Sequence, residues 1–184
     1  PGRGPAPRGC GPVPVRAPDR AVSAGPYRVR MLSLTAARPA DCDALARTSR
    51  AAFDADVLVG APGPGGPPGY DSAEWCRRAL VWGRVFVIAE DGCTVGGAIL
   101  IAHSADWMEL GRVWLEPSVQ GRGLGQALLA DLEQRAPAVR RWTLDTPAWN
   151  LRNRHFYARC GYAEVGIDGD SVRFEKRVEA ETPG

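Results

Sequence analysis

The sequence predicts an α/β (α+β) fold, a single domain with a mixed, mostly antiparallel, twisted sheet of about six to seven strands and about four helices on its faces. Segments with alternating apolar residues are interspersed with segments of helical periodicity. Three successive strand-like segments lie directly before a glycine-rich turn, and a helix, a strand and a further helix follow it. A chain of 184 residues with 45% hydrophobic content can bury one sizeable core but hardly two.

The chain divides unevenly. Residues 1–26 are dense in Pro, Gly and Arg and lack periodic apolar positions, so we expect a disordered leader there. We expect the folded domain at residues 27–178 and a short C-terminal tail at 179–184.

A strand and a helix open the predicted domain. Tyr27 to Leu34 alternates as a strand, and Pro39 to Phe53 carries apolar residues at helical spacing after a proline start. Val59 to Gly69 is rich in proline and glycine and can only be a loop. A second helix is predicted from Asp71 to Val81.

Three successive strands are predicted next, and the turn signal Asp91-Gly92 joins the first two. They are Val85 to Glu90, Thr94 to Ala102 and Trp107 to Leu115. The remaining pattern predicts a helix at Gly123 to Ala136, a strand at Arg140 to Asp145, a helix at Asn150 to Cys160, and short strands at Ala163 to Val165 and Val172 to Arg177. This order indicates a mixed sheet with helices on its faces.

The stretch Leu115-Glu-Pro-Ser-Val-Gln-Gly-Arg-Gly-Leu-Gly125 lies between the third of these strands and the following helix. Its glycines, Gly121, Gly123 and Gly125, can adopt backbone angles barred to other residues and leave no Cβ in the way. They expose successive N–H groups at a helix N-terminus, where the helix dipole favours an anion by about 0.3–1 kcal/mol. The stretch therefore predicts a cradle for phosphate.

Two better-known phosphate-binding motifs do not match the residues of this stretch. The dinucleotide fingerprint requires Gly where Gln126 stands, and the nucleoside-triphosphate loop requires Gly-Lys-Ser/Thr, whereas Lys176 is the only lysine of the chain. What remains is Gln-x-x-Gly-x-Gly at Gln120, Gly123 and Gly125. This motif resembles the acyl-coenzyme A pyrophosphate loop of the GNAT N-acetyltransferase superfamily.

A second motif follows at a suitable distance. Asn150-Leu-Arg-Asn-Arg-His-Phe-Tyr-Ala-Arg-Cys-Gly-Tyr162 resembles the superfamily's later segment, with an Asn, a Phe-Tyr pair on a helix, then Gly and an aromatic. Asn150 lies seven residues before Tyr157, about two helical turns, so both can face one groove. The resemblance implies acetyl-coenzyme A (acetyl-CoA) as co-substrate, an amine acceptor and no metal.

The resemblance also implies a set of cofactor contacts. The backbone of the third strand's end should pair with pantetheine amides, and the glycine loop should hold the pyrophosphate. Arg122 either adds a charged contact or faces solvent, and Asn153 is a rival to Asn150 for the pantetheine arm. The cofactor-binding residues implied are Val113, Trp114, Leu115, Gln120, Gly121, Arg122, Gly123, Leu124, Gly125, Asn150 and Asn153.

Glu109 is the candidate general base. It lies eleven residues before Gln120, where the resemblance places a glutamate base in histone-modifying members. By the period of two, Glu109, Gly111, Val113 and Leu115 are expected to share one face of the strand. The alternative is an exposed strand glutamate paired with an arginine.

Tyr157 is the candidate that the resemblance places at the coenzyme sulfur as general acid. A phenol of pKa about 10 donates to a thiolate of pKa near 8.5 at a cost of about 2 kcal/mol, so hydrogen bonding to the sulfur is easier than free proton transfer. The alternative is a packed amphipathic aromatic.

Charge and composition argue against nucleic-acid-binding, disulfide-stabilised, zinc-binding and membrane-spanning proteins. The net charge of +2 gives no strong basic field, so we expect no nucleic-acid partner. Several arginines in the C-terminal half are interpreted as solvated or as contacting the adenosine phosphate of the cofactor. They are Arg135, Arg140, Arg141, Arg152, Arg154 and Arg159. The five cysteines are odd in number and contain no C-x-x-C pair, which argues against a disulfide frame or a zinc site. His103 and His155 are expected to be structural or peripheral. We expect no membrane span, a cytoplasmic location and, as an open alternative to a monomer, a homodimer.

The sequence says least about the identity of the acceptor, the amine that would receive the acetyl group. Acidic residues near the expected acceptor segments favour a cationic small amine, although such aspartates equally satisfy turns and helix caps. They are Asp54, Asp56, Asp106, Glu109, Asp168 and Asp170. A small-molecule N-acetyltransferase is the first hypothesis, and a peptide or protein N-acetyltransferase and a non-catalytic coenzyme A-binding domain are the alternatives.

Overall fold

The structure is a computed structural model and describes residues 32–179. The expected leader, the first residues of the strand expected at Tyr27 to Leu34, and the tail beyond residue 179 lie outside the described residues.

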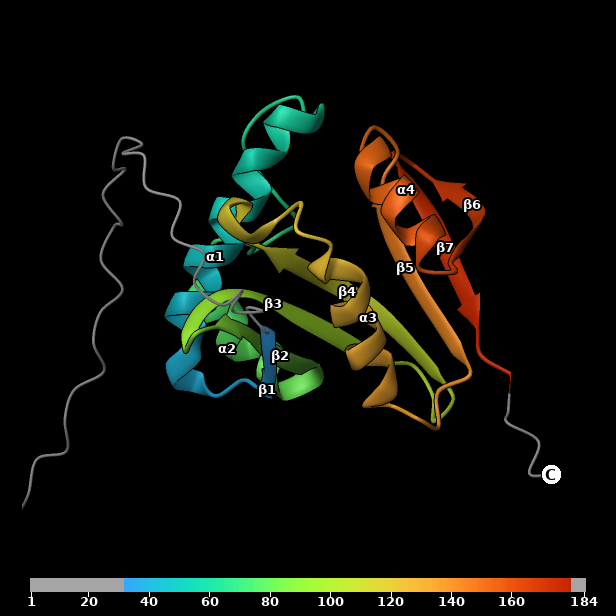
Figure 1. Ribbon diagram of the computed structural model, residues 1–184, viewed down its shortest axis with the longest axis horizontal. Helices are drawn as coiled ribbons and strands as arrows, with labels where there is room; N and C mark the ends of the chain where they lie inside the picture. The colour runs from blue at the N-terminus through green and yellow to red at the C-terminus, as the bar shows by residue number, and fades with distance from the viewer. Residues whose placement is uncertain (1–31, 180–184) are drawn as a thin grey trace, which may run out of the picture.

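The fold is one seven-stranded mixed sheet with helices on both faces, as predicted (Figure 1). The strand order is β1-β2-β3-β4-β5-β7-β6. The strands are β1 (Leu32–Ala36), β2 (Arg84–Glu90), β3 (Cys93–Ala102), β4 (Trp107–Leu115), β5 (Arg141–Pro147), β6 (Ala163–Asp168) and β7 (Ser171–Arg177). The α-helices are α1 (Cys42–Asp54), α2 (Ala73–Trp82), α3 (Leu124–Gln134) and α4 (Leu151–Arg159), and short 3-10 turns are η1 (Pro39–Asp41), η2 (Ala55–Val59) and η3 (Pro117–Val119).

The element ends lie within a few residues of those predicted, except that β6 is longer than expected. The turn between β2 and β3 is confirmed, because Asp91 and Gly92 both have positive φ, 51° and 80°. None of the helices within residues 32–179 is long and apolar enough to cross a membrane.

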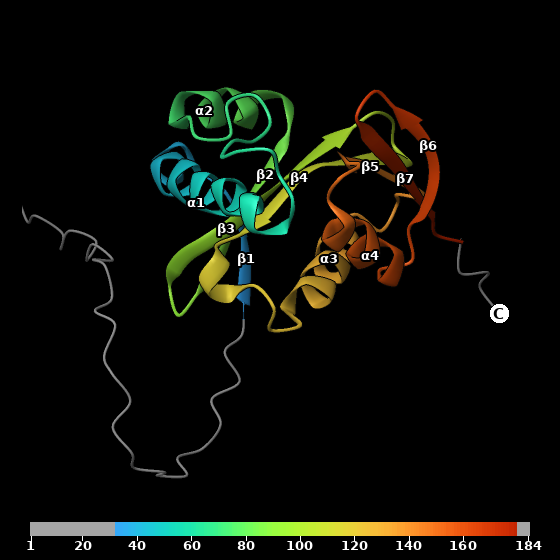
Figure 2. The ribbon, with the colours of Figure 1, turned by 90° about the horizontal axis from the view of Figure 1, so that it is seen from above.

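Two cores lie on opposite faces of the sheet (Figure 2). The smaller core packs α1 and α2 against β2, β3 and β4, with Leu45 and Trp114 buried in it. The larger core packs α3 and α4 against the sheet, around the fully buried Trp142 and Phe174. Burial of these apolar faces is what holds each helix layer in place.

β4 and β5 separate part-way along their length, as Figure 1 shows. They are the parallel neighbours of the sheet, and they pair only from Trp107↔Arg141 to Glu109↔Thr143. Beyond this point β5 leaves β4, so the last part of β4 has a strand partner on one side only. The separation opens the sheet next to the glycine loop.

One prediction about β4 is wrong, because a β-bulge at Gly111 interrupts the alternation of its side chains. Two steps along β3 correspond to three steps along β4 at this point. Glu109 therefore does not share a face with Val113 and Leu115. The pairs that define the bulge are Ile101↔Glu109, Leu100↔Leu110 and Ile99↔Arg112.

The bulge assigns the side chains of β4 to different layers. Leu110, Val113 and Leu115 pack with the core under α3 and α4. Glu109 and Arg112 lie on the opposite face with Trp114, which packs in the core under α1 and α2. The candidate base is thus on the face opposite α3.

Candidate active site

The glycine loop has the backbone geometry that the motif predicts. Gly121 and Gly123 have φ of 73° and 76°, in the left-handed region, and Gly123 is the N-cap of α3. Apart from its chain neighbours, no atom of residues 32–179 lies within 4 Å of a Cβ added to either glycine, so the space above them is open. At Gly125 a Cβ would lie 2.9 Å from the Phe156 ring, so this glycine is needed for α3 to pack against α4.

The N–H groups of the loop are available to a ligand. In η3 the N–H groups of Val119 and Gln120 donate to Glu116 and Pro117. No turn or loop hydrogen bond within residues 32–179 uses the N–H groups of residues 121–125. Since the first N–H groups of a helix have no partner within it, these donors and the dipole of α3 fit a diphosphate.

The loop borders a pocket of about 660 Å³ that reaches from the end of α1 to α3 and α4. All of the predicted cofactor-binding residues line this pocket except Arg122 and Asn150, and Tyr157 lines it too. The structure therefore brings together two motifs that are separated in sequence.

The end of β4 contributes an open backbone edge to this pocket. Glu116 N–H donates to Val95 C=O (2.7 Å), so these two residues are a hydrogen-bonded pair. Bonded and non-bonded pairs alternate along antiparallel strands, so Val113 and Leu115 turn their N–H and C=O away from β3. They point to the side that β5 has left, where Gln120 Nε2 bonds the C=O of Leu115 (2.6 Å). An extended ligand with amide groups fits this edge.

Tyr157 is buried, with 8% of its surface exposed. Its ring lies 5.9 Å from that of Phe174 and 6.1 Å from that of Tyr162, centroid to centroid. Burial, foremost, raises the pKa of the Tyr157 phenol well above its usual value. The side chain is therefore a neutral hydrogen-bond donor at physiological pH.

The two candidate asparagines take different places. Asn150 is the N-cap of α4, where its Oδ1 accepts the N–H of Asn153 (3.0 Å). Asn150 is fully buried, and its Nδ2 has no hydrogen-bond partner among the described residues. Such a donor costs about 1–3 kcal/mol unless an acceptor reaches it. Asn153, in contrast, lines the pocket, so the choice between the two stays open.

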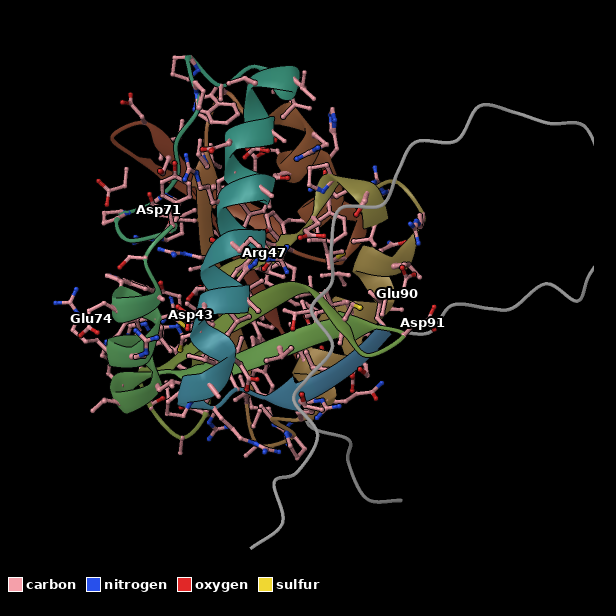
Figure 3. The ribbon with its side chains drawn as sticks, turned by 90° about the vertical axis from the view of Figure 1, so that its left-hand side faces the viewer. Asp43, Arg47, Asp71, Glu74, Glu90 and Asp91 are labelled. Carbon is pink, nitrogen blue, oxygen red and sulfur yellow. The ribbon has the colours of Figure 1, made fainter. Side chains whose placement is uncertain are left out.

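Two arginines near the glycine loop, Arg122 and Arg152, differ in whether they face the pocket. Arg122 turns away from the pocket. Its guanidinium donates to the Glu90 carboxylate (2.8 Å) and to the C=O of Ser118 (2.6 Å). Figure 3 shows Glu90 near the end of β2. Arg152 lines the pocket and bridges Asp56 (3.0 Å) and the Oε1 of Gln120 (3.1 Å). Sequence reasoning placed Arg152 only within a cluster of arginines, because its pairing with Asp56 is a tertiary contact.

Glu109 lies at the point where β4 and β5 separate, since its pair with Thr143 is the last between the two strands. Its Oε2 is 2.7 Å from Nε2 of His103, whose ring stacks on Trp107 at 4.3 Å. Glu109 does not line the pocket that contains Tyr157. His103, expected to be structural or peripheral, is thus a partner of the candidate base that the hairpin between β3 and β4 brings close.

Comparison with known proteins agrees with this geometry. A model described as the acetyltransferase (GNAT) family matches residues 55–162, more than half of the chain. The chain belongs to the GNAT acetyltransferase family. Membership indicates an acyltransferase.

Solved structures share the fold of this GNAT domain at low sequence identity. PaiA N-acetyltransferase from Thermoplasma acidophilum, in complex with coenzyme A, is 17% identical with a TM-score of 0.70, over 80% of this chain and 99% of that one. An acetyltransferase from Thermus thermophilus is 20% identical with a TM-score of 0.68, over 82% and 99%. The ribosomal-protein-S18-alanine N-acetyltransferase from Escherichia coli is 16% identical with a TM-score of 0.64, over 84% and 99%. At these identities the likeness concerns the GNAT fold alone.

Proposed function

We propose that this protein is an N-acetyltransferase that moves an acetyl group from acetyl-CoA to a primary amine of a small molecule, by direct attack in a ternary complex. The observation that carries this proposal is the lining of one pocket, which holds the glycine loop, the open edge of β4 and Tyr157. PaiA, which shares the fold and was solved with coenzyme A, supports the choice of cofactor.

In this proposal, the residues of the pocket bind the diphosphate and the pantetheine arm of acetyl-CoA. The N–H groups of residues 121–125 hold the diphosphate at the N-terminus of α3. The backbone of Val113 and Leu115 pairs with the pantetheine amides. Arg152 adds a positive charge on the pocket wall, and the unpaired Nδ2 of Asn150 or the side chain of Asn153 takes up the pantetheine arm.

Acetyl-CoA supplies the thioester carbonyl that the amine attacks and the sulfur that leaves. Only the neutral amine attacks, and for an alkylamine of pKa 10.4 neutrality at pH 7 costs about 4.6 kcal/mol. Glu109, on the opposite face of the sheet, accepts the proton of the amine, and His103 holds the Glu109 carboxylate in place. Tyr157 donates a hydrogen bond to the departing sulfur.

Peptide or protein N-acetylation is the second candidate. It is favoured by the face of β5 and β7 on the side of α1, which no helix of the described residues covers (Figure 2). A chain-like acceptor could lie along this face and still reach Glu109. The cytoplasmic location and the homodimer stay predictions.

Acetyl-CoA-dependent release of thiol, measured with a panel of small amines and short peptides, tests the function. We expect release with small primary amines and less with peptides. Binding of coenzyme A without thiol release for any acceptor would leave only a non-catalytic coenzyme A-binding domain.

Replacing the candidate base, Glu109, is expected to change how kcat/KM depends on pH. Glu109→Gln is expected to lower kcat/KM at pH 7 by about 100-fold, because glutamine accepts no proton from the amine. The loss should shrink as the pH rises towards the pKa of the amine, since more of the amine is then neutral without help. The measurement is kcat/KM against pH for both proteins.

Glu74→Gln is the control, because Glu74 is an exposed glutamate on the surface of α2 (Figure 3). It should leave the pH profile unchanged. A loss for Glu109→Gln that is the same at all pH values would exclude Glu109 as the base.

A further inference from the structure

Arg112 is an arginine in an unusual place. Its guanidinium lies 4.4 Å from the ring centroid of Trp75 and 5.9 Å from that of Phe53, and one nitrogen donates to the C=O of Pro68 (3.1 Å). No Asp or Glu of residues 32–179 forms an ion pair with it. Within residues 32–179, the guanidinium of Arg112 therefore contacts two aromatic rings and one carbonyl oxygen.

Burial lowers the pKa of Arg112 to about 10, so the group is still a cation at neutral pH. A guanidinium carries five N–H donors in a planar fork that matches a carboxylate. A partly desolvated cation is costly until an anion meets it. Four other arginines around the site have acidic partners, in the pairs Arg122–Glu90, Arg141–Glu175, Arg152–Asp56 and Arg173–Asp145. Arg159 also lines the pocket without an acidic partner among residues 32–179, but it lies on α4, away from the face of β4 that carries Glu109.

The position of Arg112 links it to the reaction site. The bulge at Gly111 places Arg112 on the same face of β4 as Glu109, opposite Ile99 and Ile101 of β3. These two β3 positions are two residues apart, about 7 Å along the strand. Phe53, beside the guanidinium, also lines the pocket that holds the glycine loop. The cation therefore lies between that pocket and the loop that contains Pro68.

The acidic residues that favoured a cationic acceptor are largely engaged. Asp54 accepts the hydroxyl of Tyr70 (2.8 Å), and Asp56 pairs with Arg152 (3.0 Å). Asp168 lies 3.9 Å from a nitrogen of Arg173. Asp54 and Asp56 are therefore used within the protein, and Asp168, which is 81% exposed, makes only a long contact. Arg112, by contrast, has no acidic partner among residues 32–179 and lies on the face of β4 that carries Glu109.

We propose that Arg112 binds a carboxylate of the acceptor, and that the acceptor is a short amine of the amino-acid type whose amino group lies towards Glu109. This inference rests on the proposed function and narrows its substrate class. The guanidinium fork fixes the carboxylate, and the roughly 7 Å between the β3 positions opposite Arg112 and Glu109 suits a short molecule.

Matched acceptors test the proposal in the full chain. The probes are phenylalanine with phenethylamine, and leucine with isopentylamine, because each pair differs only by the carboxylate. We expect the wild-type kcat/KM to be at least 10-fold higher for the amino acid of each pair. Arg112→Met should remove this advantage and leave kcat/KM for the two plain amines within about 3-fold, since methionine still packs on Trp75.

Arg77→Met is the control, because Arg77 lies on α2 with Trp75 but pairs with Asp43. It should preserve the preference for amino acids. Arg112→Lys keeps the charge without the fork and should retain part of the preference, so it serves if Arg112→Met does not fold.

Three outcomes overturn the inference. Turnover of plain amines without preference for amino acids excludes the carboxylate site and leaves the proposed function standing. Equal losses for both members of each pair in Arg112→Met mean that Arg112 only anchors the loop at Pro68. The absence of thiol release with every acceptor overturns the transferase proposal and this inference together.

Discussion

Gly123→Asp is expected to abolish measurable coenzyme A binding, with a loss of affinity of at least 100-fold. Gly123 is the N-cap of α3 with φ of 76°, and a side chain there would enter the open space proposed for the diphosphate. A carboxylate about 4 Å from a phosphate charge costs about 4 kcal/mol at an effective dielectric constant of 20. The affinity is measured by isothermal titration calorimetry.

The variant should still fold. Aspartate tolerates the left-handed region better than most residues, and among residues 32–179 no atom beyond the chain neighbours of Gly123 lies within 4 Å of the new Cβ. Gly169→Asp is the matched control, because Gly169 has φ of 56° and open space around it but lies in the turn between β6 and β7. An unchanged affinity for Gly123→Asp would place the diphosphate elsewhere.

Tyr157→Phe is expected to lower kcat by about 10- to 100-fold while changing the affinity for coenzyme A by less than 3-fold. Phenylalanine keeps the packing against Phe174 and Tyr162 but removes the neutral hydroxyl that donates to the sulfur. The measurement is kcat from thiol release, together with calorimetric binding of coenzyme A.

Tyr162→Phe provides the comparison for this prediction. Tyr162 is buried in the same aromatic cluster, but its hydroxyl donates to Glu133 (2.9 Å) and it does not line the pocket. This variant should lose stability and keep its kcat. Equal losses of kcat and of binding in Tyr157→Phe would assign Tyr157 to cofactor binding instead.

Local sequence patterns were sufficient for the fold and the loop. Alternating and helical periodicities give the order of strands and helices, and the positive φ of Gly121 and Gly123 follows from the glycines of the motif. The pocket brings this loop together with α4, as two separate motifs had suggested. The order of the elements and the backbone of the loop depend on a few neighbouring residues, whereas the pocket was expected from the resemblance of both motifs to one family.

Features that depend on pairing between distant segments were not predictable. The bulge at Gly111 depends on the register of β3 and β4 and reverses the face on which Glu109 was expected. The contact of His103 with Glu109 follows from the same hairpin. The surroundings of Arg112 come from three other segments of the chain, and no pattern near Arg112 indicates them.

The central claim is that the backbone N–H groups of residues 121–125 hold the diphosphate of acetyl-CoA. Amide NMR spectra of the wild-type protein, titrated with coenzyme A and with pantetheine, test it most directly, because pantetheine lacks the diphosphate. The account predicts that the amide signals of Gly121, Gly123 and Gly125 shift strongly with coenzyme A and little with pantetheine. Signals that stay in place at saturating coenzyme A would contradict it.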